Sequence, residues 1–570
     1  MKARLWSCVV TLVLFSWGLL GCASEGRPPH VPPTLIPPSR GGAAWVEITS
    51  KHFRLLTDAP TEVARETSTE LERYYGALED SAFRGPDRVR ARVAVVQFWH
   101  EDDFRAITGT RVGWYTQSEH PLDLDPSTTL VFYGPFVESS RRMVLHELTH
   151  RFLARSVGGL PPFLEEGIAQ YYSTLRLDWG SVHLGEALPL GSVARGIVED
   201  MDQRVGSAWR QTSMSGPMPD FITVATDSLP PISTIMSLDR HAFLGGDAPL
   251  GESMRTAVAN SLAAWAFVHM LHFGPQSYRT AYDTFIHDVL NGRAARQAWA
   301  DAFRLVPEAA LERDFHAYMK KKELTAARYP FTPRPLDPVE ARRTLPESEI
   351  HVLWARLRMS NAASFSVMFD DSDDLRVEQQ RREEAAAKDL DDAIAIDPQS
   401  AEARFWRGLF LSRRRNFVRA GDDLHVALGM APDEPRFHLG LAATLFEATR
   451  VKPDDASLRE LATEVAWLQE HAAGAYELDF LARYHQRVGA KDEALQFAQN
   501  AIRTDPTCRR CLNTYANVLY AQGHVKEAVA AKRRSMDLAP DVVLPFRTVE
   551  ELRCFEKRPT PSSCLVSEKP

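Results

Sequence analysis

The chain has 570 residues, and its 67 Lys and Arg residues against 75 Asp and Glu residues give a formal net charge of −8. A nucleic-acid-binding protein usually carries a basic surplus, so the charge argues against that class. Hydrophobic residues make up 44% and charged residues 25% of the chain, which argues against bulk disorder, and the length predicts two to four domains.

The first 21 residues are typical of an export signal. Lys2 and Arg4 precede an apolar stretch, residues 5–20, that is too short to span a bilayer comfortably. The stretch runs into Leu-Leu-Gly-Cys at residues 19–22, which resembles the lipobox of bacterial lipoproteins. This resemblance implies that Cys22 is lipidated and anchors the protein to a membrane of a bacterial cell envelope, on the periplasmic or surface side. An ordinary signal peptide with a chance Cys is the alternative.

Residues 22–44 are predicted to form a proline-rich spacer, because three Pro-Pro pairs favour an extended chain. Residues 45–328 are predicted to form a mixed α/β domain. Alternating or short apolar runs predict strands at 45–49, 52–57, 93–98 and 129–133. Helices are expected at 61–82, from about residue 139 onward, at 261–272 and at 294–303.

The motif HExxH occurs in the predicted helical region, as His146-Glu147-Leu-Thr-His150. Residues four apart share one face of a helix, so both imidazoles can bind one metal ion, with Glu147 placed to act as a general base rather than as a ligand. Chance alone would produce this motif in roughly one such sequence in 25, so the motif indicates a metal site only together with the residues around it.

A catalytic zinc ion needs a third protein ligand and an open fourth position. The pattern HExxHxxGxxH fails, because Leu153 and Ser156 stand where Gly and His are required. Downstream, Glu165-Glu166-Gly167 opens a second predicted helix and resembles the gluzincin arrangement, in which the Glu of a Glu-Gly pair completes a His₂Glu site. Adjacent helical residues point about 100° apart, so only one of the two Glu residues can face the metal, and the Glu-Gly match favours Glu166.

Several segments together resemble the bacterial peptidase MA-like family. They are HELTH, LPPFLEEGIAQYY at 160–172, LAAWAFVHML at 262–271, WVEITSKHF at 45–53 and VGWY at 112–115. The resemblance covers about residues 45–324 and implies an α+β gluzincin-like zinc metallopeptidase domain. It implies that His146, His150 and Glu166 bind Zn²⁺ and that Glu147 is the general base for hydrolysis of a peptide or protein substrate.

The sequence departs from the family at one point. The family often shows a Tyr, which would stabilise the oxyanion, shortly before the Ser-Trp pair of the later helix, but residues 261–265 contain none. The candidate substitutes, each of which can equally be a packing or surface residue, are Tyr172, Tyr278, Tyr282 and His269. His269 and His272 could also form a second metal site, although packing or surface roles are favoured for both.

Residues 329–346 contain five prolines and are predicted to be a linker. Beyond it, Pro398 and Pro432 are 34 residues apart, as are Pro506 and Pro540, and this period resembles the tetratricopeptide repeat. An all-α repeat solenoid is therefore predicted for 347–545, with six extra residues at 451–456 and an acidic insertion at 370–382 that interrupts the first repeat. A generic helical array is the alternative.

A Cys-containing tail is predicted for residues 546–570. Two disulfides are expected among Cys508, Cys511, Cys554 and Cys564, because an exported chain meets an oxidising compartment, but the sequence does not choose among the three pairings. Cys508-Arg-Arg-Cys511 can also be read as a redox or zinc motif.

Two classes of function follow. The first is a membrane-anchored zinc metallopeptidase of the cell envelope, with repeats that bind a substrate or protein partner. The second is a non-catalytic envelope lipoprotein that uses the repeats as a binding scaffold. The intact HExxH and Glu-Gly motifs favour the first class, and the missing Tyr favours the second.

Overall fold

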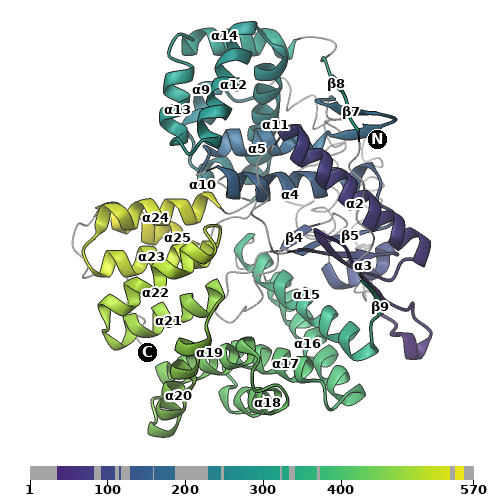
Figure 1. The fold of residues 1–570 in the computed structure, drawn as a ribbon, viewed down its shortest axis with the longest axis vertical. Helices are drawn as coiled ribbons and strands as arrows, with labels where there is room; N and C mark the ends of the chain where they lie inside the picture. Colours follow the sequence, from purple (N-terminus) through teal and green to yellow (C-terminus); the bar gives the residue numbers. More distant parts are fainter. Residues whose placement is uncertain are drawn as a thin grey trace, which may run out of the picture.

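The computed structural model describes residues 35–82, 92–108, 114–116, 129–157, 159–186, 229–245, 250–320, 324–332, 341–368, 373–538 and 546–557. An N-terminal α/β region is followed by an array of paired helices (Figure 1). The predicted signal segment and Cys22 lie outside the described residues. Among the described helices, none is both long and apolar enough to cross a membrane.

A six-stranded mixed sheet forms the first part of the N-terminal region. Its strand order is β4-β5-β3-β2-β1-β9, in which β2, β3 and β5 are parallel and the other neighbours are antiparallel. The strands span Val46–Thr49 (β1), Phe53–Thr57 (β2), Val93–Phe98 (β3), Trp114–Thr116 (β4), Thr129–Tyr133 (β5) and Ala341–Thr344 (β9). Every residue of β3 is buried, as expected for a central strand covered on both faces.

Helices cover both faces of this sheet. Val95 and Val96 point to opposite faces because side chains alternate along a strand. Val95 joins the core that contains residues of α2 and α4, whereas Val96 joins a core with residues of α3 and α15. These helices span Thr61–Ala82 (α2), Glu138–Ser156 (α4), Glu101–Thr108 (α3) and Glu347–Met368 (α15). The first helix of the array is therefore also part of the second layer on the sheet.

Both ends of the predicted linker 329–346 form paired strands. Its beginning belongs to β8 (Ala327–Pro330), which pairs with β7, and its end supplies β9, which pairs with β1. Pro330 is tolerated because β8 is the edge strand of a three-stranded sheet. All four residues of β9 are exposed, so no apolar alternation marks it as a strand.

The end of the predicted spacer is also packed against the fold. Leu35 is buried in the core between the sheet and α15. Ser39 donates hydrogen bonds from its backbone N and from Oγ to the carboxylate of Glu347, both of 2.7 Å. Two residues of the predicted spacer 22–44, Leu35 and Ser39, therefore contact the folded part of the chain.

Helices and the three-stranded sheet β6-β7-β8 make up the rest of the N-terminal region. α5 packs between α4 and α11, and residues 262–271 of α11 are all buried. The elements of this part are α5 (Pro162–Ser173), β6 (Arg176–Asp178), β7 (Ser181–Leu184), α9 (Ile232–Ser237), α10 (Arg240–Phe243), α11 (Leu250–Phe273), α12 (Gln276–Leu290), α13 (Ala295–Ala302) and α14 (Glu308–Met319). The buried helix expected at 261–272 is thus the second half of α11.

The C-terminal part is an array of consecutive antiparallel helix pairs, as the 34-residue period predicts. Gly408 shows why small residues recur: a Cβ atom there would lie 2.6 Å from Leu424 Cγ in the partner helix. The helices are α16 (Asp373–Ile396), α17 (Ala401–Arg413), α18 (Phe417–Met430), α19 (Pro435–Val451), α20 (Asp455–His471), α21 (Ala475–Val488), α22 (Lys491–Thr504), α23 (Arg509–Ala521), α24 (Val525–Asp537) and α25 (Phe546–Lys557). In Figure 1 they form an arc from α15, beside the sheet, to α24, below α10.

The expected insertions are extensions of helices. α16 already begins at Asp373, so most of the segment 370–382 is helical and does not interrupt the repeat. Its Glu and Gln residues are good helix formers, and Gln380 donates to Glu384 one turn away. The extra residues near 451–456 similarly lengthen α19 and α20 to 17 residues each, compared with 13 and 14 for α17 and α18.

Candidate metal centre

Helix α4 places the two histidines of the HExxH motif one turn apart on one face. His146 and His150 are 8% and 5% exposed, and their Nε2 atoms lie 3.1 Å apart. Glu147 lies between them in the sequence and is also buried. The burial follows from the apolar residues Val144 and Leu145 that pack this helix into the core.

Helix α5 brings a carboxylate to the same point. Glu166 Oε1 lies 3.8 Å from His146 Nε2, and Oε2 lies 3.5 Å from His150 Nε2. Among the described residues, these three side chains form a group whose donor atoms can surround one ion. The chain reaches this position because Pro161 and Pro162 end the connection from α4 and start α5.

The three donors fit a zinc ion. In a tetrahedral zinc site the ligand atoms lie about 2.0–2.1 Å from the metal, so they are separated from one another by about 3.3–3.4 Å. The two imidazole nitrogens are 3.1 Å apart, and the two oxygens of Glu166 lie 3.5 Å from His150 Nε2 and 3.8 Å from His146 Nε2, respectively, so the separations bracket that value. With one donor atom from each residue, all three atoms lie within 4.8 Å of one another. Two imidazole nitrogens and one carboxylate are also a donor set of catalytic zinc sites, which leave a fourth position open.

Neighbouring side chains orient the donors. Glu165 Oε1 lies 3.1 Å from His150 Nδ1, the ring nitrogen that faces away from the other donors. If Nδ1 carries the proton, Nε2 presents its lone pair to a metal ion. Gln170 donates from Nε2 to Glu166 Oε1 at 2.9 Å. The structure thus separates the two glutamates: Glu166 joins the donors, and Glu165 contacts the far side of a donor histidine.

The Gly of the Glu-Gly pair has a packing role. A Cβ atom on Gly167 would lie 2.5 Å from the backbone O of Ala264 and 2.7 Å from Cγ2 of Val268. Both residues belong to α11, so the absence of a side chain lets α5 approach α11 closely. This contact fixes the helix that carries Glu166.

Two of the residues considered as oxyanion stabilisers have hydrogen-bond partners of their own. His269 is fully buried and hydrogen-bonded at both ring nitrogens, to Tyr318 Oη at 2.7 Å and to Gly185 O at 2.8 Å. Tyr278 donates to Asp314 at 2.6 Å, and burial together with this bond raises the pKa of its phenol to about 12. Neither of these two residues joins the three donors.

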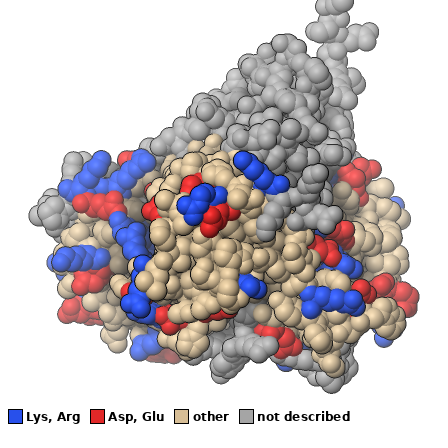
Figure 2. Space-filling model, turned by 90° about the horizontal axis from the view of Figure 1, so that it is seen from above, with Lys and Arg blue, Asp and Glu red and all other residues tan. Residues whose placement is uncertain are grey.

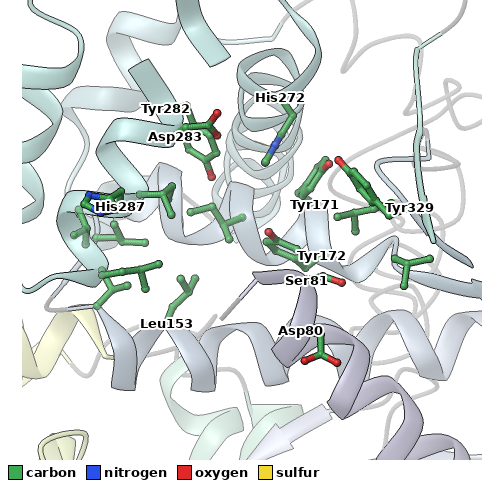
Figure 3. A pocket seen from close by; sticks show the side chains of 18 of the residues that line it. Asp80, Ser81, Leu153, Tyr171, Tyr172, His272, Tyr282, Asp283, His287 and Tyr329 are labelled. Atoms are coloured by element: carbon green, nitrogen blue, oxygen red, sulfur yellow. The ribbon is translucent and has the colours of Figure 1, made fainter. Parts of the chain in front are cut away.

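Tyr172 and Tyr282 line a cavity of about 930 Å³, together with His272 and Tyr171 (Figure 3). Burial raises the pKa of both phenols. Burial, reinforced by His269, lowers the pKa of His272 to about 3. None of the three donor residues is among the described residues that line this cavity, and His269 and His272 do not form a metal site with other described side chains.

The described cysteines are placed as follows. Cys508 and Cys511 form a disulfide at the start of α23, and both residues are buried, with 3% and 0% exposure. Cys554 is disulfide-bonded as well. Cys564 lies outside the described residues. Burial of the Cys508–Cys511 bond argues against a thiol–disulfide exchange site.

Charged side chains of both signs share one face of the molecule. On the face in Figure 2, basic and acidic side chains are interspersed around a broad area of uncharged residues.

Sequence reasoning missed three supporting residues. Gln170 could have been predicted from helical spacing, because it lies one helical turn after Glu166. Arg240, whose Nη2 donates to Glu165 Oε2, and Arg534, which contacts the end of α4, come from distant segments that carry no motif. Tertiary packing alone brings them to the site.

Comparisons with known proteins give similarities to solved repeat proteins. No protein-family profile and no curated protein matches the chain. The tetratricopeptide-repeat protein TTC0263 of Thermus thermophilus is 15% identical, with a TM-score of 0.29, over 32% of this chain and 95% of its own. YrrB, described as a tetratricopeptide-repeat protein with an unusual peptide-binding site, is 16% identical, with a TM-score of 0.22, over 34% of this chain and 86% of its own. Yeast Tom70 is 14% identical, with a TM-score of 0.23, over 74% of this chain and 87% of its own.

Proposed function

We propose that the N-terminal region is a gluzincin-type zinc metallopeptidase that hydrolyses peptide bonds. The observation that carries this proposal is the convergence of His146, His150 and Glu166 to donor separations of 3.1–3.8 Å beside the buried Glu147. The resemblance of residues 45–324 to the peptidase MA-like family points to the same chemistry.

Zn²⁺ held by His146, His150 and Glu166 would supply Lewis acidity for attack on a peptide carbonyl. Glu147, on the same helix as the two histidines, would take a proton from the attacking water and pass it to the leaving amine. Glu165 would hold His150 in the tautomer that leaves Nε2 free to bind, and Gln170 would hold the Glu166 carboxylate.

The helical array favours a second, binding function. Consecutive helix pairs present an extended surface, which repeat proteins commonly use to hold a peptide or protein. In this chain the array would hold the substrate or a protein partner while Cys22 anchors the N-terminus to a membrane of the cell envelope. A non-catalytic lipoprotein that uses the array as a scaffold is the alternative, and the observed array is what favours it.

The test is a digest of a peptide library by the purified protein without its signal segment, combined with metal analysis. We expect the parent to bind about one Zn²⁺ and to cleave peptides. Glu147→Gln should abolish cleavage yet retain zinc, because the residue is a base and not a ligand. His146→Ala serves as the control that loses both. A parent that binds zinc but cleaves nothing would favour the scaffold.

A further inference from the structure

The end of the helical array docks on the helix that carries the HExxH motif. Arg534, in the last turn of α24, donates from Nη2 to the backbone O of Ala154 at 3.1 Å and from Nη1 to that of Val157 at 3.4 Å. The last carbonyls of a helix lack partners within the helix and carry partial negative charge, so a guanidinium stabilises them. The array therefore caps the C-terminus of α4.

A second contact reaches Glu165, the partner of the donor His150. Arg240, which is 5% exposed, donates from Nη2 to Glu165 Oε2 and to the backbone O of Asp537 at 3.0 Å. The other oxygen of Glu165 contacts His150 Nδ1 at 3.1 Å. A continuous chain of hydrogen bonds thus links a metal donor to the C-terminal end of α24, through Glu165 and Arg240.

Charged groups of both signs meet at this junction. Glu165 and Asp537 supply two carboxylates, and Arg240 and Arg534 supply two guanidinium groups, from α5, α10 and α24. Gly159 keeps the approach open: a Cβ atom there would lie 3.2 Å from Arg534 Nη1 and 3.5 Å from Asp537 Oδ2. Removal of one partner would leave a poorly compensated charge in a buried place, so the junction depends on all four groups.

The array is fixed to the N-terminal region at its other end too. Arg358 of α15 donates from Nη1 to the backbone O of Ala106 in α3 at 2.8 Å, and Trp354 is buried against the sheet. An arc that is held at both ends places α24 at a defined position (Figure 1). The position of α24 relative to α4 and α5 is therefore set by the whole array.

We propose that the C-terminal end of the helical array is part of the metal centre: through Arg240 and Glu165 it positions His150, so that docking of α24 raises the affinity of the site for zinc. The inference rests on the proposed zinc site. Arg240 and Arg534 are positioning residues, because neither touches the metal donors directly. Coupling between two sites is reciprocal, so zinc should in turn strengthen the docking of α24.

The first experiment is a zinc titration of the full chain against a chelator. Arg534→Ala changes a residue of the array that contacts no donor, and we expect zinc affinity to fall by about 10–100-fold, the size of losses from outer-shell changes. Arg240→Met should have an equal or larger effect, and Arg534→Lys, which keeps the charge, should recover part of the loss. The matched control is Arg414→Ala: Arg414 lies in the array, where it pairs with Glu383 of α16, and its removal should leave zinc affinity unchanged.

The second experiment needs no variant. Hydrogen exchange of the backbone amides of α24 in the parent should slow when zinc is added, while exchange in α18, in the middle of the array, should not change. A parent that binds zinc, with unaltered affinity in Arg534→Ala and Arg240→Met, would overturn the coupling and leave the proposed zinc site standing. Equal hydrogen exchange of the α24 amides with and without zinc would also overturn the coupling and leave the proposed zinc site standing. A parent that binds no zinc would overturn both proposals.

Discussion

Glu165 and Glu166 are adjacent in the sequence, yet their carboxylates contact opposite sides of the same histidine. Glu166 Oε2 lies 3.5 Å from His150 Nε2, and Glu165 Oε1 lies 3.1 Å from His150 Nδ1. The roughly 100° turn between neighbouring helical residues accounts for this division. One carboxylate is placed as a ligand and the other as a holder of the ligand.

This division predicts unequal effects of two matched substitutions. Glu166→Ala removes one of three protein donors, so it should empty the site at low free zinc. Glu165→Ala removes only the partner of His150 Nδ1, so zinc should bind about 10–100-fold more weakly but still bind. Zinc titration against a chelator measures both. The opposite order would move the ligand to Glu165, and no effect of either change would remove the gluzincin interpretation.

Gly167→Ala tests the packing that positions Glu166. The added Cβ atom would lie 2.5 Å from the backbone O of Ala264, which cannot rotate away, so α5 and α11 must separate. Overpacking of this kind typically costs about 1–3 kcal/mol of folding free energy, and the displaced Glu166 should also weaken zinc binding. Thermal unfolding and the same zinc titration measure the two effects.

The control for this change is Gly76→Ala in α2, where a Cβ atom would meet nothing within 4 Å. Ala is preferred to Gly inside a helix by roughly 0.5–1 kcal/mol, so this variant should be at least as stable as the parent. Equal stability of the two variants would mean that the contact between α5 and α11 is looser than the structure places it.

The sequence predicts the parts of the site that depend on local geometry. His146, Glu147 and His150 are related by helical spacing alone, and the Glu-Gly pair identifies Glu166 through a resemblance. Arg240 comes from a four-residue helix 75 residues beyond Glu165, and Arg534 comes from the far end of the array. No periodicity or motif connects such segments, so only the folded structure can show that they meet.

The strands of the large sheet also include some that the sequence pattern predicts and one that it does not. The strands β1, β2, β3 and β5 are predicted because apolar residues alternate or cluster in them. β9 is not predicted, because its sequence Ala-Arg-Arg-Thr is fully exposed. It is a strand because its backbone pairs with β1 and because Arg343 bridges Glu47 and Glu349. Proline density near it suggested a linker, although prolines are compatible with edge strands and with the loops between them.

His272 predicts a specific acid sensitivity. Burial lowers the pKa of its imidazole from 6.5 to about 3, and Tyr171 stacks on the ring at 4.2 Å between centroids. The folded state therefore keeps this residue neutral where the unfolded chain would protonate it. Because the unfolded state then binds more protons, this contribution to stability is fully present above pH 6.5 and is lost as the pH falls from 6.5 towards 3.

The variant His272→Phe keeps an aromatic ring in the cavity wall but cannot be protonated. The difference in free energy of unfolding between parent and variant should therefore shift in favour of the variant by up to about 1.4 kcal/mol for each pH unit below 6.5, and stay constant above it. Urea unfolding at pH 7.5, 6.5, 5.5 and 4.5 measures this slope. The control is the same change at a second histidine that lines this cavity: His287→Phe, measured at the same four pH values, replaces a side chain that is 76% exposed. Parallel pH dependence of the parent and His272→Phe would show that the imidazole of His272 is protonated as readily in the folded chain as in the unfolded one.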